Sequence, residues 1–583
     1  MVKNRVKLAL AALLLLTLAV PAFVLAQQGP GRRRDNSSAA PTQPAPNGPA
    51  SRNTRRPAPA EASTALEEDF SEALSVIQEN YVDGNKLDYN NTFKSSIIGM
   101  LRSLDPHSNY YDAKEFEEMR TDWRSEYYGI GASIGDRTIG EQTDTYVLAT
   151  FENSPAARAG LRFGDKIIAV DGQDMHGHPS AEVRDKIRGP RNSIVKITVE
   201  TAADGSRRTV EITRDAVAQP SVPDAYMIKP GVGYIDMTRG FNYTTADEFN
   251  DAIDKLHQQG MTSLVLDLRG NPGGLLDQAV KVASHFLPAG QPILSQRGRA
   301  SGSHTYRSDN TTPDNVPLVV LVNRGTASAS EIVAGALQDH DRALIIGETS
   351  FGKGLVQSII PLEYGTALTL TSSKYYTPSG RLVQRDYTNE GLYDYYTHGG
   401  TLAQDDTGAT TPEKPTGPES KTDTGRSVYG GGGITPDEPV KPRVFQPVQQ
   451  RMTNPIFAFV RELVNGRING FENYKVQHAI DFSHDIKTDE FPVTDNLFKA
   501  FKEFVAKEPA YKLSDKQLDA NRDFIARQMR SDIATAAYGT TMAARVVTID
   551  DVQVTKAIED LPRAGQLAAA ARAGHNPQQK SFE

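Results

Sequence analysis

Apolar residues recur along the chain with changing periods, and the first of these is helical. Phe70, Leu74 and Ile77 follow one another at helical spacing after a capping-box sequence that begins at Thr64. This pattern predicts an N-terminal helical region over residues 64–112, with its first helix starting at the capping box.

The period then shortens to two. Short apolar stretches alternate with turn signals, and Val195, Ile197 and Val199 alternate strictly with polar residues. A half-buried strand shows this alternation because successive side chains point to opposite faces of a sheet. Residues 113–215 are therefore predicted to form a small β-rich domain.

Residues 216–395 repeat a third pattern, in which an apolar strand, a glycine turn and a helix follow one another. The first unit places a strand at 264–268 and a helix at 275–287. The second places a strand at 318–322 and a helix at 328–340. Such alternation is typical of βαβ units around a largely parallel sheet.

The remaining C-terminal sequence divides into a polar segment and a helical one. Residues 396–435 are rich in Gly, Thr, Pro and Asp, and are expected to form a low-complexity surface excursion. Residues 436–583 carry apolar positions at helical spacing and predict a C-terminal helical region. The expected fold class is therefore multidomain α+β, with a small β-rich domain before an α/β core and helical regions at both ends.

The first residues have the pattern of an export signal. Residues 1–26 begin with the basic side chains of Lys3, Arg5 and Lys7 and continue as an apolar run. We expect this signal to be cleaved, with an uncleaved membrane anchor as the alternative. Either outcome places the rest of the chain outside the cytoplasm, as in a periplasm. Residues 27–63 are rich in Pro and Arg and are expected to be a disordered linker.

Composition excludes several classes of protein. The 583 residues include 64 Lys and Arg against 72 Asp and Glu, a net charge of −8, so no general basic field is available for nucleic acid. There is no cysteine, which excludes disulfides, a thiol nucleophile, iron–sulfur clusters and every Cys-containing zinc site. A nucleophile must therefore be sought among the hydroxyl groups.

Ser328 is a candidate nucleophile. It stands where a predicted strand turns into a helix, so its hydroxyl projects beside the free N–H groups and positive end of that helix. Negative charge that develops on a substrate oxygen would be stabilised there. From this stretch alone, the alternative is that Ser328 or Ser330 only caps the helix.

A candidate base lies in the glycine-rich sequence that follows the next strand. Residues 347–353 match a phosphate-binding loop, but Gly354 lacks the hydroxyl that Mg²⁺ requires, and a strand pattern follows where such a loop needs a helix. Lys353 could instead act as a general base, because burial lowers the pKa of an amine. Gln357, four residues later, could hold that amine in position.

His340 is an alternative base, but it falls at the opposite end of the predicted Ser328 helix. At 1.5 Å per residue it lies about 18 Å from the serine, which is too far for proton transfer. We expect it to act as a charge at the helix C-terminus.

Several strings of the sequence resemble the carboxy-terminal processing (tail-specific) serine peptidases, a family that carries a PDZ domain. They occur in the family's order between about residues 65 and 385. The strings are residues 104–108, 129–132, 154–161, 266–274, 326–339, 347–357 and 375–381. One departure is Thr326, where serine is common in the family; the hydroxyl is kept, so activity is expected.

The resemblance implies a role for each residue of the site. Ser328 would be the nucleophile, Lys353 the general base 25 residues later, and Gln357 the residue that orients the lysine. The backbone amides of Ala329 and Gly274 would form the oxyanion hole. No metal or other cofactor is implied.

The resemblance also identifies the β-rich domain as a PDZ domain. Its carboxylate-binding loop corresponds to Tyr128, Gly129, Ile130 and Gly131. Backbone N–H groups of this loop can surround the C-terminal carboxylate of a peptide that adds to the domain as a strand. Arg188 corresponds to an arginine linked to PDZ-dependent activation, with an ordinary surface arginine as the alternative.

The expected function is that of an exported serine endopeptidase that binds protein C-terminal tails and cleaves them through an acyl-enzyme. Expected partners are those tails, an adaptor or activator protein and further copies of the chain. No nucleic acid is expected, and membrane contact is expected only through an uncleaved N-terminus. The alternative is a catalytically silent PDZ scaffold outside the cytoplasm, which predicts loss of Ser328 or Lys353; both are present.

Overall fold

The computed structural model describes residues 59–124, 126–388, 395–396, 417–476 and 479–574. The predicted export signal, most of the predicted linker and much of the low-complexity segment lie outside the described residues. The chain contains two compact units, residues 1–96 and 97–583, and each is described by itself.

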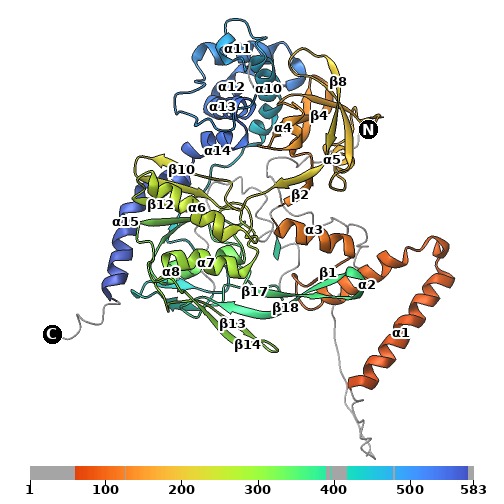
Figure 1. The fold of residues 1–583 in the computed structure, drawn as a ribbon, viewed down its shortest axis with the longest axis vertical. Helices are drawn as coiled ribbons and strands as arrows, with labels where there is room; N and C mark the ends of the chain where they lie inside the picture. Colours follow the sequence, from red (N-terminus) through yellow and green to blue (C-terminus); the bar gives the residue numbers. More distant parts are fainter. Residues whose placement is uncertain (1–58, 125, 389–394, 397–416, 477–478, 575–583) are drawn as a thin grey trace, which may run out of the picture. The chain divides into compact units, whose positions relative to one another are not determined.

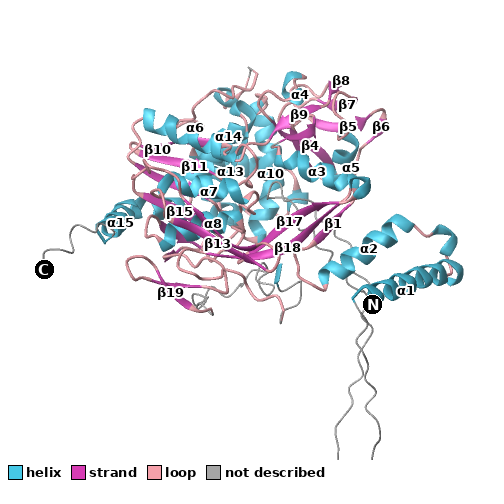
Figure 2. Cartoon of the chain, turned by 60° about the horizontal axis from the view of Figure 1, so that its bottom comes forward, coloured by secondary structure: helices cyan, strands magenta, loops and turns pink. Residues whose placement is uncertain are grey.

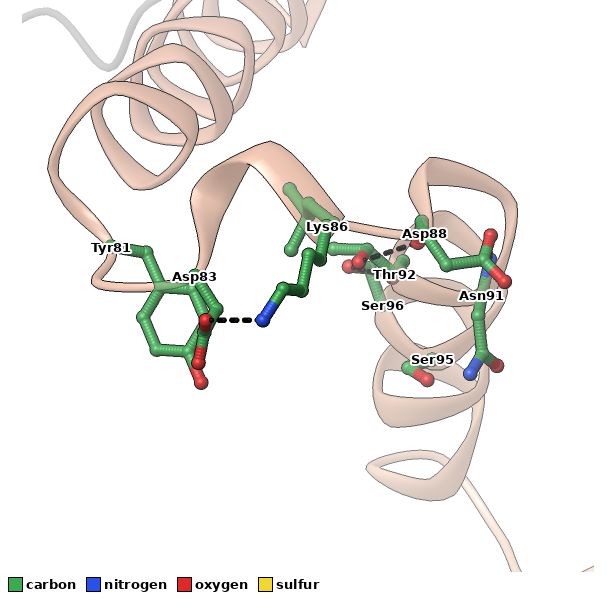
Figure 3. Close-up of a pocket in the computed structure, with 9 residues that line it drawn as sticks. Tyr81, Asp83, Lys86, Asp88, Asn91, Thr92, Ser95 and Ser96 are labelled. Atoms are coloured by element: carbon green, nitrogen blue, oxygen red, sulfur yellow. Dashed lines mark hydrogen bonds and ion pairs between the residues drawn. The ribbon is translucent and has the colours of Figure 1, made fainter.

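The described part of the N-terminal unit is helical. Helix α1 (Pro59–Asn80) is followed by the short helix η1 (Gly84–Lys86) and by the beginning of α2 (Tyr89–Arg102). α1 starts before Thr64, so the capping-box sequence lies inside the helix. Pro is favoured at a first helical position, and the Ala and Glu that follow it here are strong helix formers. Polar side chains of η1 and α2 line an open hollow (Figure 3).

The β-rich domain is an antiparallel sheet of order β3-β4-β5-β7-β8, with β6 paired to β5. Its strands are β3 (Ala132–Ile139), β4 (Gln142–Thr150), β5 (Lys166–Val170), β6 (Gln173–Asp174), β7 (Ile194–Glu200) and β8 (Arg207–Thr213). Val195, Ile197 and Val199 are fully buried, as their period of two predicts. Helices α4 (Pro155–Arg158) and α5 (Ser180–Ile187) contribute to the same core.

The second sheet is largely parallel, as the βαβ pattern predicts. Its order is β10-β11-β12-β15-β16-β21, and β10 is antiparallel to its neighbour. The strands are β10 (Asp224–Lys229), β11 (Val232–Asp236), β12 (Ser263–Asp267), β15 (Leu318–Val322), β16 (Leu344–Gly347) and β21 (Glu438–Pro439).

Helices cover both faces of this parallel sheet (Figure 1). α6 (Thr245–Gln258), α7 (Leu276–Phe286) and α8 (Ala329–Asp339) pack on one face. α15 (Val552–Gly574) packs on the other. The central strands are therefore buried on both sides, which explains why they consist of unbroken apolar runs.

A third, antiparallel sheet has the order β1-β18-β13-β14, and β17 also pairs with β18. Its strands are β1 (Asn109–Tyr111), β13 (Pro292–Gly298), β14 (Gly302–Arg307), β17 (Leu355–Pro361) and β18 (Ala367–Tyr376). Helix α8 lies beside β13 (Figure 2). Because β1 pairs with β18, the segment that precedes β1 is brought to a strand more than 250 residues later in the sequence.

The C-terminal region is helical and contacts two different domains. Its helices before α15 are α10 (Pro447–Val464), α11 (Asp495–Ala506), α12 (Asp515–Ala520), α13 (Arg522–Tyr538) and α14 (Thr540–Ile549). The ring of Phe457 on α10 lies 5.3 Å from that of Tyr146 and 5.1 Å from that of Phe163 in the β-rich domain. Among the described helices, none has both the length and the apolar character needed to cross a membrane.

The remaining elements are short connectors. They are α3 (Ala113–Trp123), β2 (Glu126–Gly129), β9 (Asp215–Ala218), η2 (Glu363–Gly365), η3 (Glu472–Tyr474) and η4 (Pro509–Tyr511). β2 and β9, which come before and after the sheet of the β-rich domain in the sequence, pair with each other.

Part of the segment expected to be a surface excursion is built into the core. β19 (Glu419–Lys421) and β20 (Ser427–Tyr429) form a hairpin, and Val428 and Ile434 are buried. The guanidinium of Arg426 donates to two carboxylates of the core. The low-complexity composition suggested an exposed segment and did not predict this burial. The glycines of the segment lack side chains, so its backbone can approach the core closely.

Replacing Phe457 by Ala should destabilise the contact between α10 and the β-rich domain. The side chain is 2% exposed, so the change removes apolar burial and leaves a cavity, with an expected loss of about 3 kcal/mol. The denaturation midpoint in urea, followed by tyrosine fluorescence, measures this loss. Tyr364→Ala is the control: that ring is 92% exposed, and a change of about 0.5 kcal/mol or less is expected. Equal effects of both substitutions would contradict the packing described.

Candidate active site

Ser328 lies between strand β15 and helix α8 in a strained backbone conformation. Its φ of 55° and ψ of −115° are unusual for a residue with a side chain, and such a conformation costs on the order of 1–3 kcal/mol. The preceding turn is held by the buried hydroxyl of Thr326, which donates to the carbonyl of Leu268 at 2.8 Å and accepts from the amide of Asn323 at 2.9 Å. The Thr326 hydroxyl therefore stabilises the turn that precedes Ser328.

A glycine turn packs directly against Ser328. A Cβ atom on Gly273, whose φ is +92°, would lie 2.7 Å from the Cβ of Ser328, so only glycine fits there. Asn271 fixes the turn: its carbonyl accepts from the amide of Ala327 at 2.9 Å and from the hydroxyl of Ser330 at 3.1 Å. The hydroxyl of Ser330 is thus used inside the core and does not cap the helix.

The two glycines of this turn differ in their amide groups. The N–H of Gly273 donates to the side-chain oxygen of Asn271 at 2.9 Å. Among the bonds of the described residues, none has the amide of Gly274 or that of Ala329 as donor. Two unused donors therefore stand near Ser328, one from the turn and one from the start of α8.

Glu331 joins the Ser328 turn to the segment that carries Lys353. The backbone amides of Ser328 and Lys353 donate to the same carboxylate oxygen, Oε2, at 2.8 and 2.9 Å. These two residues, far apart in the sequence, are therefore neighbours in the fold.

The other oxygen of Glu331 is also fully engaged. Oε1 accepts from the hydroxyl of Ser350 at 2.5 Å and from the amide of Gly352 at 2.7 Å. Burial raises the pKa of the completely buried Glu331 carboxyl, and these hydrogen bonds act in the opposite direction. We infer an ionised carboxylate, since all four partners present hydrogen to it.

The Lys353 amine lies in surroundings that favour its neutral form. Burial lowers its pKa to about 8, and the negative charges of Glu331 and Asp105 limit the decrease. His107 is close enough to feel the lysine charge, and burial together with that charge lowers its pKa to about 3. Among the described residues, no hydrogen bond joins the amine of Lys353 to the hydroxyl of Ser328, and bonds of this kind often tighten only when substrate is bound.

Gln357 lies on β17, the strand that follows the lysine. A register irregularity between Val356 and Gln357 interrupts the pairing of β17 with β18. The side-chain amide of Gln357 donates to the hydroxyl of Thr371 at 3.2 Å. The structure therefore places Gln357 in a hydrogen-bond network beside the lysine segment.

His340 caps the far end of α8, as expected. Its Nδ1 lies 2.7 Å from a carboxylate oxygen of Asp423, and its Nε2 lies 2.7 Å from the carbonyl oxygen of Pro292. Burial acts to lower its pKa, but these two acceptors outweigh it and raise the pKa above the ordinary value. Since both partners only accept, the imidazole is held in its doubly protonated form and is no base for Ser328.

The predicted carboxylate-binding loop lies at the start of the β-rich domain. Tyr128 and Gly129 end β2, while Ile130 and Gly131 lead into β3, which stands at an edge of its sheet. Gly131 has a φ of +73°, and a Cβ atom there would lie 2.3 Å from that of Ser154.

Arg188 is exposed at the C-terminal end of α5. Its guanidinium lies 6.0 Å from the ring of Tyr127, the residue directly before the loop. Burial raises the pKa of that tyrosine to about 12. The structure therefore places Arg188 near the loop, with the Tyr127 ring as its contact.

The sequence motifs did not single out Glu331 and Arg269 as residues of the site. Glu331 stands three residues after Ser328, which is the capping-box spacing and could have signalled a carboxylate bonded to the Ser328 amide. Arg269, in the glycine turn, donates to Asp551 at 2.8 Å and to Gln553 at 2.7 Å. No local signal could have found these two partners, because they lie at the start of α15.

Comparisons with known proteins match both the peptidase and the PDZ segments of the chain. The family model of peptidase family S41 matches residues 231–390, and a PDZ domain model matches residues 149–201. A carboxy-terminal-processing protease of Bartonella bacilliformis is 39% identical over 324 residues, which cover 54% of this chain and 72% of that protein. The carboxy-terminal processing protease CtpB of Bacillus subtilis is 33% identical over 319 residues, covering 54% and 65%.

Among solved structures, the photosystem II D1 C-terminal processing protease is 32% identical, covers 54% of this chain and 89% of that chain, and has a TM-score of 0.32. The sequence matches define a serine peptidase that carries a PDZ domain before its peptidase domain. The chain belongs to the carboxy-terminal processing protease family. The predicted fold class and enzyme class are thereby confirmed.

Replacing Glu331 by Gln should disturb both halves of the site. An amide NH₂ would then face two hydrogen-bond donors, so we expect a stability loss of about 3 kcal/mol. We also expect a fall in peptidase activity of about 100-fold, because the Ser328 and Lys353 segments lose their common anchor. Urea denaturation and peptide cleavage measure the two effects. Glu363→Gln, at an exposed carboxylate, is the control and should change neither. A Glu331→Gln protein with parental stability would contradict the buried anchor.

Proposed function

We propose that this peptidase is exported and cleaves flexible protein tails with a dyad of Ser328 and Lys353. The observation that carries the proposal is the convergence of their backbone amides on one oxygen of Glu331. It supports a pairing of the Ser328 hydroxyl, at a helix N-terminus, with the Lys353 amine, whose pKa is lowered by burial. A hydroxyl nucleophile and an unprotonated amine base are the two groups that serine–lysine catalysis requires.

In the proposed reaction, the neutral amine of Lys353 takes the proton of the Ser328 hydroxyl as its oxygen attacks the peptide carbonyl carbon. The C–N bond then breaks, and the lysine gives its proton to the leaving amine. Water then attacks the ester on Ser328 while Lys353 removes one of its protons; the C–O bond to Ser328 breaks, and the lysine gives that proton to the serine oxygen as the acid product leaves. Each turnover returns both side chains to their starting protonation states.

The proposed oxyanion hole consists of the amides of Ala329 and Gly274. Support comes from the bond between the Gly273 amide and Asn271, which leaves Gly274 as the unengaged donor of the turn. Fixed backbone donors stabilise the charge that develops on the carbonyl oxygen of the tetrahedral intermediate. The second donor is at the start of α8, where the positive end of the helix adds to the same effect.

We propose further that the PDZ domain captures the C-terminal carboxylate of a substrate at residues 128–131. The position of β3 at the edge of its sheet supports this proposal, because a peptide strand can add to a free edge. Arg188 is proposed to couple this occupancy to activity through its contact with Tyr127.

The boundaries proposed for the PDZ domain and the catalytic core remain residues 113–215 and 216–395. Residues 1–26 support an extracytoplasmic location, through their basic start and apolar run. An adaptor protein and self-association are proposed partners, supported by the amphipathic C-terminal helices. A silent PDZ scaffold is the alternative, and the cleavage experiment separates the two.

Ser328→Ala and Lys353→Ala should each reduce cleavage of an unstructured protein with a free C-terminus by a factor of about 10⁴ or more, because each removes one member of a unit that acts together. Gel analysis of the products with purified protein measures this. The matched controls Ser358→Ala and Lys374→Ala change exposed residues on β17 and β18 and should retain parental rates. Undiminished cleavage by either active-site variant would refute the dyad, and an inactive parent protein would favour a required activator or the scaffold.

The rate should depend on pH through Lys353. A base must be unprotonated, and burial lowers the pKa of this amine to about 8, so the active fraction grows as pH rises through that value. We expect kcat/KM to increase about tenfold per pH unit below that pKa and to level off above it. Initial rates on a peptide substrate at closely spaced pH values test this. A profile that rises instead through the ordinary pKa range of histidine would point to a different base.

A further inference from the structure

Building on the proposed Ser328–Lys353 dyad, we propose that Asp105 and Thr371 are positioning residues that orient Gln357 toward the lysine. They form a relay of hydrogen bonds that starts at a buried carboxylate and ends at the Gln357 side-chain amide. The relay assigns a positioning role to the segment around Asp105, which takes no part in the Ser328–Lys353 dyad itself.

The contacts of the relay are continuous. Gln357 Nε2 donates to Thr371 Oγ1 at 3.2 Å, and Thr371 Oγ1 donates to Asp105 Oδ1 at 3.0 Å. Gln357 and Thr371 are partners in the register between β17 and β18, so the backbone already places them opposite each other. The irregularity beside Gln357 shifts that register locally, as bulges near active sites often do to redirect a side chain.

The carboxylate at the start of the relay is firmly held. Asp105 is 6% exposed and accepts from the amides of His107 and Ser108, both at 2.8 Å, and from the Ser108 hydroxyl at 2.6 Å. The Ser108 hydroxyl oxygen in turn accepts from the amide of Thr371 at 3.0 Å. Burial acts to raise the pKa of Asp105, but these hydrogen bonds outweigh it and lower the pKa below the ordinary value. The group is therefore ionised and can only accept.

An acceptor at one end fixes the direction of every bond in the relay. The hydroxyl of Thr371 has a single hydrogen, which it gives to Asp105, so toward Gln357 it can only accept. Gln357 must then present its NH₂ group to Thr371, which prevents the amide from turning over. Its carbonyl oxygen is left to accept from an amine, and the lysine amine is the donor that this site offers.

The same carboxylate also acts on the lysine through its charge. The charged and titratable groups that face the Lys353 amine are Glu331, Asp105 and His107. His107 is neutral, since burial and the lysine charge lower its pKa to about 3. Asp105 therefore acts on the lysine in two ways, through the relay and through its charge. Substitutions at Thr371 and at Asp105 distinguish these two effects.

Thr371→Val tests the relay, because it keeps the shape of the side chain and removes the hydroxyl. We expect kcat to fall about 10- to 100-fold, with KM unchanged within a factor of about two and the pH midpoint of kcat/KM unchanged. Thr371→Ser restores the hydroxyl and should recover kcat to within about threefold of the parent. A parental kcat in Thr371→Val, or a loss that Thr371→Ser does not recover, would overturn the relay.

Asp105→Asn tests the charge. Removing a negative charge near the amine lowers the lysine pKa, so the rise of kcat/KM should move to lower pH by about half a unit or more. Thr371→Val, which keeps the charge, serves as the comparison and should not move it. An unshifted profile in Asp105→Asn would contradict an ionised carboxylate beside the lysine.

The dyad and the relay can fail independently. Lys353→Ala is measured in the same assay: if that variant cleaves at the parental rate, the proposed function fails. If Lys353→Ala is inactive while Thr371→Val is fully active, the dyad stands and only the relay is refuted. Thermal unfolding midpoints of all variants should agree within a few degrees, and a large decrease confined to Thr371→Val would assign Thr371 a structural role and refute the proposal.

Discussion

The buried carboxylate of Glu331 is the constraint on which the rest of the site depends. It accepts four hydrogen bonds, including those from the amides of Ser328 and Lys353, so two separate segments are held against one anion. Burying a carboxylate without partners would be strongly unfavourable. A shift of either segment would remove hydrogen bonds from a buried charge, and the requirement to satisfy that charge therefore keeps the segments of the proposed nucleophile and base together.

The same low-dielectric surroundings favour Lys353 as the proposed base. The imidazole of His340 is fixed between two acceptors at the far end of α8, and that of His107 is kept neutral by burial. Burial also favours the neutral form of the Lys353 amine, which suits a base. The carboxylates of Glu331 and Asp105 limit this shift and so keep the lysine pKa close to the physiological range.

The C-terminal region, in which no chemical motif could be read, is part of the catalytic domain's structure. α15 covers the second face of the parallel sheet, and Asp551 and Gln553 at its start hold Arg269 at the foot of the glycine turn. That turn carries Gly274 toward Ser328. α10 packs on the PDZ domain instead, through Phe457, so one C-terminal region contacts both domains that the proposed function requires.

The sequence by itself determined the order of the secondary structure and the parallel sheet with its glycine turns, and it indicated Ser328 and Lys353 as the proposed dyad, because these depend on local period and on strings of neighbouring residues. It did not determine that Val428 and Ile434 enter the core, or that Asp105 meets β18. Those features arise from contacts between segments far apart in the chain. Only the tertiary structure decides which distant donors satisfy a buried carboxylate, and this sets both the geometry and the pKa values of the site.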